Sequence, residues 1–208
     1  MFGLMNEETK ITLSAKEQEL VCNTDWILTK HTIIHKVNQL FGKEAAFMQK
    51  LILNESADLP EEAKSTAPKI AKGENYNHLP YVILDYPRCF EKEKTFAIRT
   101  FFWWGNFFSI NLQLSGICKE RVLPIIQDNF SQLLQNDYWV CVSSDPWKHH
   151  FEEDNYVAIK NCTKEEFSYI LNREPFIKIG KKISLTQWNE AAAFIERSFT
   201  EMISLLKY

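Results

Sequence analysis

The clearest pattern in the chain is a strict alternation of apolar and polar residues between Phe107 and Ser115. One set is apolar and the other is polar: Phe108, Ile110, Leu112 and Leu114 against Ser109, Asn111, Gln113 and Ser115. This period is typical of an antiparallel strand with one core face and one more polar face. A second strand is predicted before it, over Thr95–Trp104, and Gly105-Asn106 between them favours a tight hairpin turn.

The hairpin has two candidate registers, because the end of its first strand is aromatic on both faces. A two-residue loop, Gly105-Asn106, pairs Trp104 with Phe107 and sets Arg99 opposite Leu112. A three-residue loop beginning at Trp104 sets Arg99 opposite Asn111 instead. A slip of one residue exchanges every face, and burying an unpaired arginine is costly, so we favour the three-residue loop. The other register stays open if a carboxylate such as Asp85 reaches Arg99.

Helical periodicity dominates the first quarter of the chain. Ser14 and Glu17 match the S-x-x-E capping box and begin a short first helix. A second helix is predicted from Thr24 to about Phe41, where Gly42 is expected to end it, and a third covers residues 43–53.

Strands and helices then alternate along the rest of the chain. Tyr81–Tyr86, bounded by Pro80 and Pro87, is predicted to be a strand. The further predicted elements are a helix over Cys118–Gln135, strands over Tyr138–Ser143 and Tyr156–Lys160, a helix capped by Thr163 and Glu166, a strand or short hairpin about Gly180, and a final helix from Ser184 or Thr186 to about Leu206 with Trp188 on its buried stripe.

This order of elements predicts an α+β fold. We expect a mainly antiparallel sheet of about five to six strands, with helices before, between and after the strands. The 208 residues suit a single domain. It would have a helical N-terminal part (12–53), a long loop (54–77) and a sheet-plus-helix part (78–208). Long loops inside a domain are usually functional or mobile, so the 54–77 loop is a candidate cover for the sheet.

Composition narrows the class of protein. Hydrophobic residues make up 45% and charged residues 25%, which is ordinary for a soluble globule. The net charge of −3 argues against a general nucleic-acid binder. No apolar run is long enough to cross a membrane, and Met1–Met5 is too short for a signal sequence. Five dispersed cysteines without a CxxC pair predict free thiols and a cytoplasmic location.

Two groups of residues suggest metal or acid–base chemistry. His31 and His35 share one helix face, but Thr32 follows the first histidine and no third ligand is identifiable. We therefore predict no metal and no cofactor. The loop Asp145–Asp154 groups carboxylates with His149 and His150, so the alternative function is an enzyme, a metal-assisted hydrolase that uses this loop.

The second face of the hairpin is the candidate binding site. Its residues, with two charged neighbours from the preceding strand, are Arg99, Phe101, Trp103, Phe107, Asn111, Gln113, Asp85 and Arg88. The mixture of aromatic and polar side chains is typical of a ligand site, and Arg99 favours an anionic or carbonyl-bearing group. The competing interpretation is that a helix or the 54–77 loop covers this face and makes it a second core.

One resemblance bears on the chain as a whole. The string GENY…LPYVILDYPR…RTFFWWGNFFS, within residues 73–116, resembles an uncharacterised bacterial protein family of similar length. The resemblance implies a complete protein and no particular activity. We expect a non-catalytic α+β domain that binds an unknown small molecule or protein, without nucleic acid or membrane partners. A third hypothesis makes the hairpin a protein–protein interface.

Overall fold

The computed structural model describes residues 12–55, 59, 61–64 and 67–206. The chain divides into two compact units, Met1–Lys36 and Val37–Tyr208. The segment Met1–Met5 lies outside the described residues, as do residues 56–58, 60 and 65–66 of the predicted long loop. No helix in the described ranges combines the length and hydropathy needed to span a bilayer.

The first unit contains helix α1 (Ala15–Cys22) and the beginning of α2 (Thr24–Glu55). The capping box is confirmed, because the Ser14 hydroxyl accepts from the Glu17 amide while the Glu17 carboxylate accepts from the Ser14 amide at 2.7 Å. Both orphan donors at the start of α1 are thereby satisfied.

The prediction that Gly42 ends a helix is wrong, since α2 runs unbroken through it to Glu55. A glycine inside a helix costs about 1 kcal/mol relative to alanine. Burial of the stripe on either side of it, including Phe41, Ala45 and Met48, offsets that cost. The predicted second and third helices are therefore one helix.

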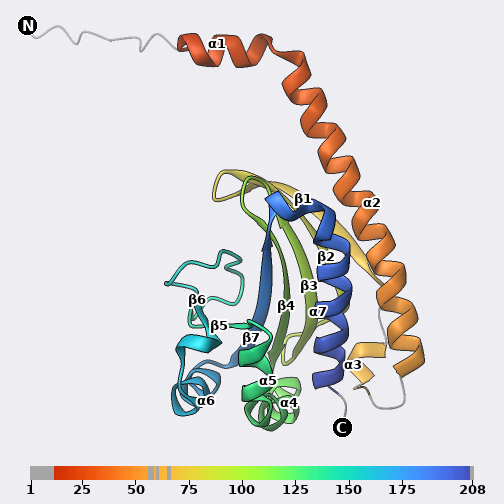
Figure 1. Cartoon of the computed structure of the whole chain (residues 1–208), viewed down its shortest axis with the longest axis vertical. Helices are drawn as coiled ribbons and strands as arrows, with labels where there is room; N and C mark the ends of the chain where they lie inside the picture. The colour runs from red at the N-terminus through yellow and green to blue at the C-terminus, as the bar shows by residue number, and fades with distance from the viewer. Residues whose placement is uncertain (1–11, 56–58, 60, 65–66, 207–208) are drawn as a thin grey trace, which may run out of the picture. The chain divides into compact units, whose positions relative to one another are not determined.

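The second unit is built on a seven-stranded antiparallel sheet with the order β1-β2-β3-β4-β7-β5-β6 (Figure 1). The strands are β1 (Lys69–Tyr76), β2 (Leu79–Phe90), β3 (Thr95–Trp103), β4 (Phe107–Ser115), β5 (Trp139–Cys141), β6 (Tyr156–Ala158) and β7 (Phe176–Ser184). The α+β class and the antiparallel sheet are confirmed, and the strand count is slightly higher than predicted.

Strand β1 accounts for the extra strand, and it falls inside the predicted 54–77 loop. It is an edge strand with mostly exposed residues, so it lacks the apolar alternation by which strands are recognised. Asn77 and His78 join it to β2 with positive φ angles of 48° and 65°. A two-residue turn of this kind pairs neighbouring strands tightly, although histidine is an uncommon residue for it.

Strand β2 is also longer than predicted, because neither Pro80 nor Pro87 ends it. The ladder with β3 shifts register between Asp85 and Arg88. The shift accommodates Pro87, which has no N–H to give to the ladder.

The three-residue loop of the central hairpin is confirmed. Trp103 pairs with Phe107, and Arg99 lies opposite Asn111. Asp85 also lies opposite Arg99 on the neighbouring strand. Asp85, which was the possible partner for Arg99 in the two-residue-loop register, therefore lies beside Arg99 in the observed register.

The remaining helices connect or follow the strands. They are α3 (Glu61–Lys64), α4 (Ile117–Asp128), α5 (Phe130–Gln135), α6 (Lys164–Arg173) and α7 (Ala191–Leu205), with short 3-10 turns at η2 (Ile159–Asn161) and η3 (Leu185–Glu190). The capping box of Thr163 and Glu166 begins α6 as predicted. The residues about Gly180 form one strand rather than a hairpin, and Trp188 is half-buried in η3 rather than buried in the final helix.

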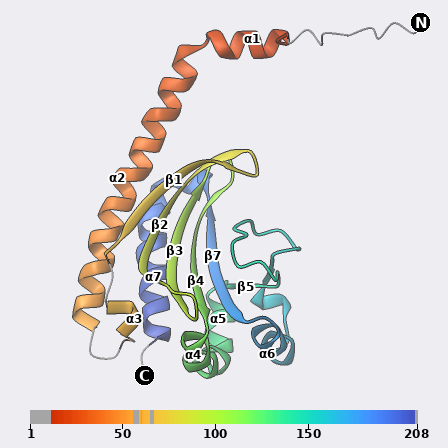
Figure 2. The same cartoon turned by 180° about the vertical axis from the view of Figure 1, so that it is seen from behind.

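The two faces of the sheet are covered differently. Helix α7 lies on one side and the connection between β5 and β6 on the other, as the two opposite views show (Figures 1 and 2). The helix-covered face carries the apolar set of β4, and Phe108 contacts the rings of Phe41 and Trp188 at centroid distances of 6.4 and 5.3 Å. The opposite face carries the predicted binding residues.

Candidate functional site

Most of the predicted site residues share one face of the sheet. Asp85, Arg99, Phe101, Trp103, Phe107, Asn111 and Gln113 come from β2, β3 and β4 in registers that place them side by side. Arg88 stands apart, because its Nε donates to the carbonyl of Ala67 at 3.1 Å. Asp85 pairs with Arg99.

The fourteen residues between Cys141 and Tyr156, here called the covering segment, close this face. Phe101, Trp103 and Phe107 are buried in a cluster with Phe151 of the segment and with Tyr156. The Phe151 and Tyr156 rings stack at 4.3 Å. The interpretation that this face is covered is confirmed, but the cover is the covering segment rather than a helix, and Tyr76, which falls in the predicted 54–77 loop, packs against the same cluster.

An ion pair lies at the centre of the covered face. Arg99 donates to both carboxylate oxygens of Asp85, with Nε–Oδ1 and Nη2–Oδ2 distances of 2.7 and 2.9 Å. The guanidinium carbon also lies 5.9 Å from the Phe90 ring centre and 5.6 Å from that of Trp147. A bidentate pair between aromatic rings is fixed in both position and orientation.

His149 extends this pair into the covering segment. Its Nε2 lies 3.4 Å from Arg99 Nη1. Since arginine only donates, Nε2 must accept, and the ring is neutral with its proton on Nδ1. Burial lowers the pKa of His149 well below its usual value, and the charges of Lys178 and Arg99 lower it further. Nδ1 is buried without a hydrogen-bond partner among the described residues.

Lys178 of β7 is a second buried cation that sequence reasoning missed. Its side chain is 2% exposed, and Nζ donates to the carbonyls of Pro146, at 2.9 Å, and Lys148. Across the described ranges no carboxylate lies within ion-pair distance of it. Burial lowers the pKa of Lys178 to about 8. Among the described residues, both of its hydrogen-bond acceptors belong to the covering segment.

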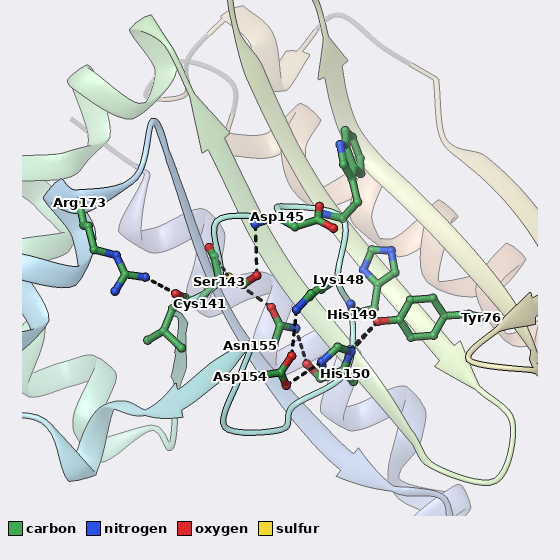
Figure 3. Close-up of polar contacts among 12 residues, drawn as sticks. Tyr76, Cys141, Ser143, Asp145, Lys148, His149, His150, Asp154, Asn155 and Arg173 are labelled. Carbon is green, nitrogen blue, oxygen red and sulfur yellow. Dashed lines mark hydrogen bonds and ion pairs between the residues drawn. The ribbon is translucent and has the colours of Figure 1, made fainter.

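Tyr76 fastens the middle of the covering segment to the edge of the sheet (Figure 3). Its hydroxyl accepts from the amides of His149 and His150, at 2.5 and 3.0 Å, and bonds to His150 Nδ1 at 2.9 Å. His150 Nε2 and Lys148 Nζ both bond to Asp154, at 3.0 and 2.9 Å. These two contacts lower the pKa of Asp154. The hydroxyl of Tyr76 is thus occupied by backbone donors rather than free to attack a substrate.

Gly180 makes room for the side-chain amide of Asn111 at the middle of the segment-covered face. Tyr156 donates from its hydroxyl to Asn111 Oδ1 at 2.8 Å, and Asn111 Nδ2 donates to Ser109 at 3.1 Å. Gly180 lies opposite Asn111 on β7, and a Cβ at this position would overlap the Asn111 oxygen. Glycine is therefore required where this side chain crosses the neighbouring strand.

Neither metal candidate has a complete ligand set among the described residues. His31 and His35 belong to the first unit, and the Asp145–Asp154 loop belongs to the second. Within the part of the chain that the structure describes, no three histidine, cysteine, aspartate or glutamate side chains are grouped so that they could hold a metal ion. The hydrolase alternative therefore has no identified ligand set.

Lys178 could have been found from the sequence. In Phe176–Gly180 the isoleucines at 177 and 179 alternate with Lys178, so a strand here places this lysine on the face opposite the apolar set. His149 carried no comparable signal, because only the path of the covering segment buries it. No family model, curated protein or solved structure matches this chain.

Proposed function

We propose that this protein is a non-catalytic binding domain, and that its ligand is an anion held on the sheet face beneath the covering segment. The main observation behind this proposal is the excess of positive charge on that face. Lys178 is buried there and the Arg99 side chain is 13% exposed, and Asp85 is the one carboxylate among the described residues within ion-pair distance of either cation. Buried charges are normally paired, and an anion would pair the lysine.

The contacts of Lys178 indicate what an anion would replace if the covering segment opened. Both of its acceptors are carbonyls of the segment, so lifting the segment leaves the ammonium without a partner. An incoming carboxylate or phosphate would replace the two carbonyls. The unpartnered Nδ1–H of His149 supplies a further donor on the segment itself, so the segment could close over the ligand.

The surroundings of the cations favour an anion with an apolar body. Phe101 and Trp103 line the same face, and Asn111 and Gln113 follow the cations along β4. Apolar walls with a few convergent polar groups are typical of small-molecule sites. Unstructured loops longer than about 12–15 residues are uncommon in compact domains and often serve as lids. We also propose a cytoplasmic location, which the five free thiols support.

Lys178→Met with an aromatic carboxylate as the probe is the sharpest test. Arg99→Ala is less informative, because it also leaves Asp85 as an uncompensated buried charge. We expect isothermal titration with benzoate to give heat with the wild type and with Lys160→Met, an exposed lysine used as the control, and none with Lys178→Met.

Inorganic phosphate and acetate, titrated in parallel, separate a general anion site from one that needs an apolar body. Binding of any of these anions that is equal in Lys178→Met and the wild type would contradict the proposed site. Absence of binding by all three would leave the covering segment as a fixed part of a second core.

A further inference from the structure

A groove runs along the outer edge of β6, where residues of the covering segment, including Glu152 and Glu153, also line it. Two surface pockets, with volumes of about 580 and 370 Å³, share Glu153, Val157 and Asn161 as lining residues. The pockets border these residues from opposite faces of β6, with Val142 and Val157 on one face and Tyr156 and Ala158 on the other, and together they are called the groove. Residues of α6, including Tyr169 and Ile170, line its other side.

The strand along this groove has an open edge. β6 is the last strand in the sheet order, and β5 pairs with it on one side. The amide of Val142 donates to the carbonyl of Asn155, and the amide of Ile159 donates to the carbonyl of Tyr138. Odd-numbered residues therefore point their backbone groups at β5, and Tyr156 and Ala158 point theirs away from it.

Two backbone groups remain for a partner strand. The Tyr156 amide bonds to the Glu152 carbonyl, and the Ala158 carbonyl accepts from the Cys162 thiol at 3.8 Å. Among the described residues, the carbonyl of Tyr156 and the amide of Ala158 have no hydrogen-bond partner, and both residues line the groove. One residue of an added parallel strand could donate to the first and accept from the second.

The negative charge of the groove favours a positively charged ligand. Its lining includes Glu152, Glu153, Glu165 and Glu166, all exposed, and no lysine, arginine or histidine. Between these carboxylates the floor is apolar, with Val157 and Ile170 central. Tyr169 is 67% exposed beside them and adds aromatic surface to the groove.

We propose that this groove docks an extended segment of a partner protein in which lysine or arginine side chains alternate with apolar ones. The backbone of the segment would pair with the edge of β6. Its apolar side chains would lie on the floor, and its cations would meet the glutamates of the rim. Strand addition gives affinity through backbone bonds and specificity through alternate side chains, which matches this combination of groups.

Ala158→Pro tests the backbone contact with little change to the fold. Ala158 has a φ of −68°, which is the value that proline requires, and its amide does not take part in the ladder with β5. The probe is a short fluorescein-labelled peptide that alternates lysine with valine, followed by fluorescence anisotropy. We expect the wild type to bind it and Ala158→Pro to bind it about tenfold more weakly, with an unchanged melting temperature.

Charge is tested with matched double variants. Glu153→Gln with Glu165→Gln should weaken binding about tenfold, whereas Glu120→Gln with Asp128→Asn, an equal charge change on exposed residues of α4, should not. Peptides alternating glutamate with valine, and lysine with serine, should bind far more weakly than the lysine–valine peptide.

Three results would overturn the proposal. The first is equal binding of the lysine–valine peptide by the wild type, Ala158→Pro and the groove double variant. The second is equal binding of the lysine–serine peptide, which would indicate a merely acidic surface. The third is no binding by the wild type. Glu153 belongs to the covering segment, but these assays contain no benzoate, phosphate or acetate, so their outcomes are distinguishable from those of the anion titrations.

Discussion

The two faces of the central hairpin come from the same eighteen residues of β3 and β4 and differ in almost every physical respect. On the helix-covered face, Phe96, Ile98, Phe108 and Ile110 are fully buried by apolar neighbours. On the segment-covered face, an ion pair, a buried lysine and a neutral histidine lie among aromatic rings. The first face derives its stability from hydrophobic burial, and the second depends on polar groups that must each keep a partner.

Phe107 and Phe108 are the most direct comparison, because they are adjacent and point to opposite faces. Phe108 is fully buried against Phe102, at 5.2 Å, as well as Phe41 and Trp188. We expect Phe108→Ala to lower the free energy of unfolding by about 3 to 5 kcal/mol, as in other large cavities between rigid elements.

Phe107→Ala should cost less, roughly 2 kcal/mol, since its neighbour Phe151 belongs to the covering segment and can move into the space. Chemical denaturation of both variants measures the difference. Equal losses would show that the covering segment packs as rigidly as the helices.

Glu44 is an ionisable exception on the helix-covered side, because it is 3% exposed and one of its carboxylate oxygens has no partner among the described residues. Burial raises its pKa to about 7, and the charge of Glu196 adds to the rise. A carboxyl group with a raised folded-state pKa favours folding fully below its unfolded value of 4.5. That contribution is lost as the pH rises through 7.

We expect the loss of unfolding free energy between pH 4.5 and 8 to be at most about 3 kcal/mol, and to disappear in Glu44→Gln. Denaturant titrations across this range measure it, with Glu19→Gln on the exposed face of α1 as the control. A wild type and Glu44→Gln with parallel pH profiles would contradict the assignment.

These examples show which features the sequence could predict. The hairpin register followed from alternation, and both capping boxes followed from local spacing, because each depends on residues close together in the chain. Strand β1 was missed because pairing with β2 stabilises it, with little burial of its own side chains. The path of the covering segment depends on distant partners such as Tyr76 and Lys178, so local sequence did not reveal it.

The close contact between the Asn111 side chain and Gly180 of β7 can be tested by adding one methyl group. Gly180→Ala would drive a methyl group into the Asn111 oxygen and close to the carbonyl of Ile110, so we expect a loss of about 1 to 3 kcal/mol, typical of overpacking. Gly42→Ala is the matched control, since no atom lies within 4 Å of its added Cβ.

In a helix interior Gly42→Ala should stabilise the protein by about 1 kcal/mol. Thermal unfolding should show a lower melting temperature for Gly180→Ala and a higher one for Gly42→Ala. A neutral effect of Gly180→Ala would show that the Tyr156–Asn111 contact is not fixed.

The smallest expected effect concerns acid opening of the segment-covered face. The unfolded chain protonates His149 near pH 6.5, whereas burial and the adjacent cations lower its folded-state pKa. The unfolded state therefore binds more protons, and stability falls as the pH falls below about 6.5. His149→Gln keeps an acceptor for Arg99 without titrating, so it should reduce this loss, whereas His35→Gln on an exposed helix face should not. Denaturation midpoints at pH 7 and pH 5.5 measure the effect.

Hydrogen–deuterium exchange of residues 142–155, with and without benzoate, tests the central claim most directly. If the face beneath the covering segment is an anion site, the segment should exchange faster than β3 and β4 in the free protein. It should then gain protection when benzoate is added, and this gain should be absent in Lys178→Met. A segment that exchanges as slowly as β4, and that no anion affects, would contradict the account and make this face a second core.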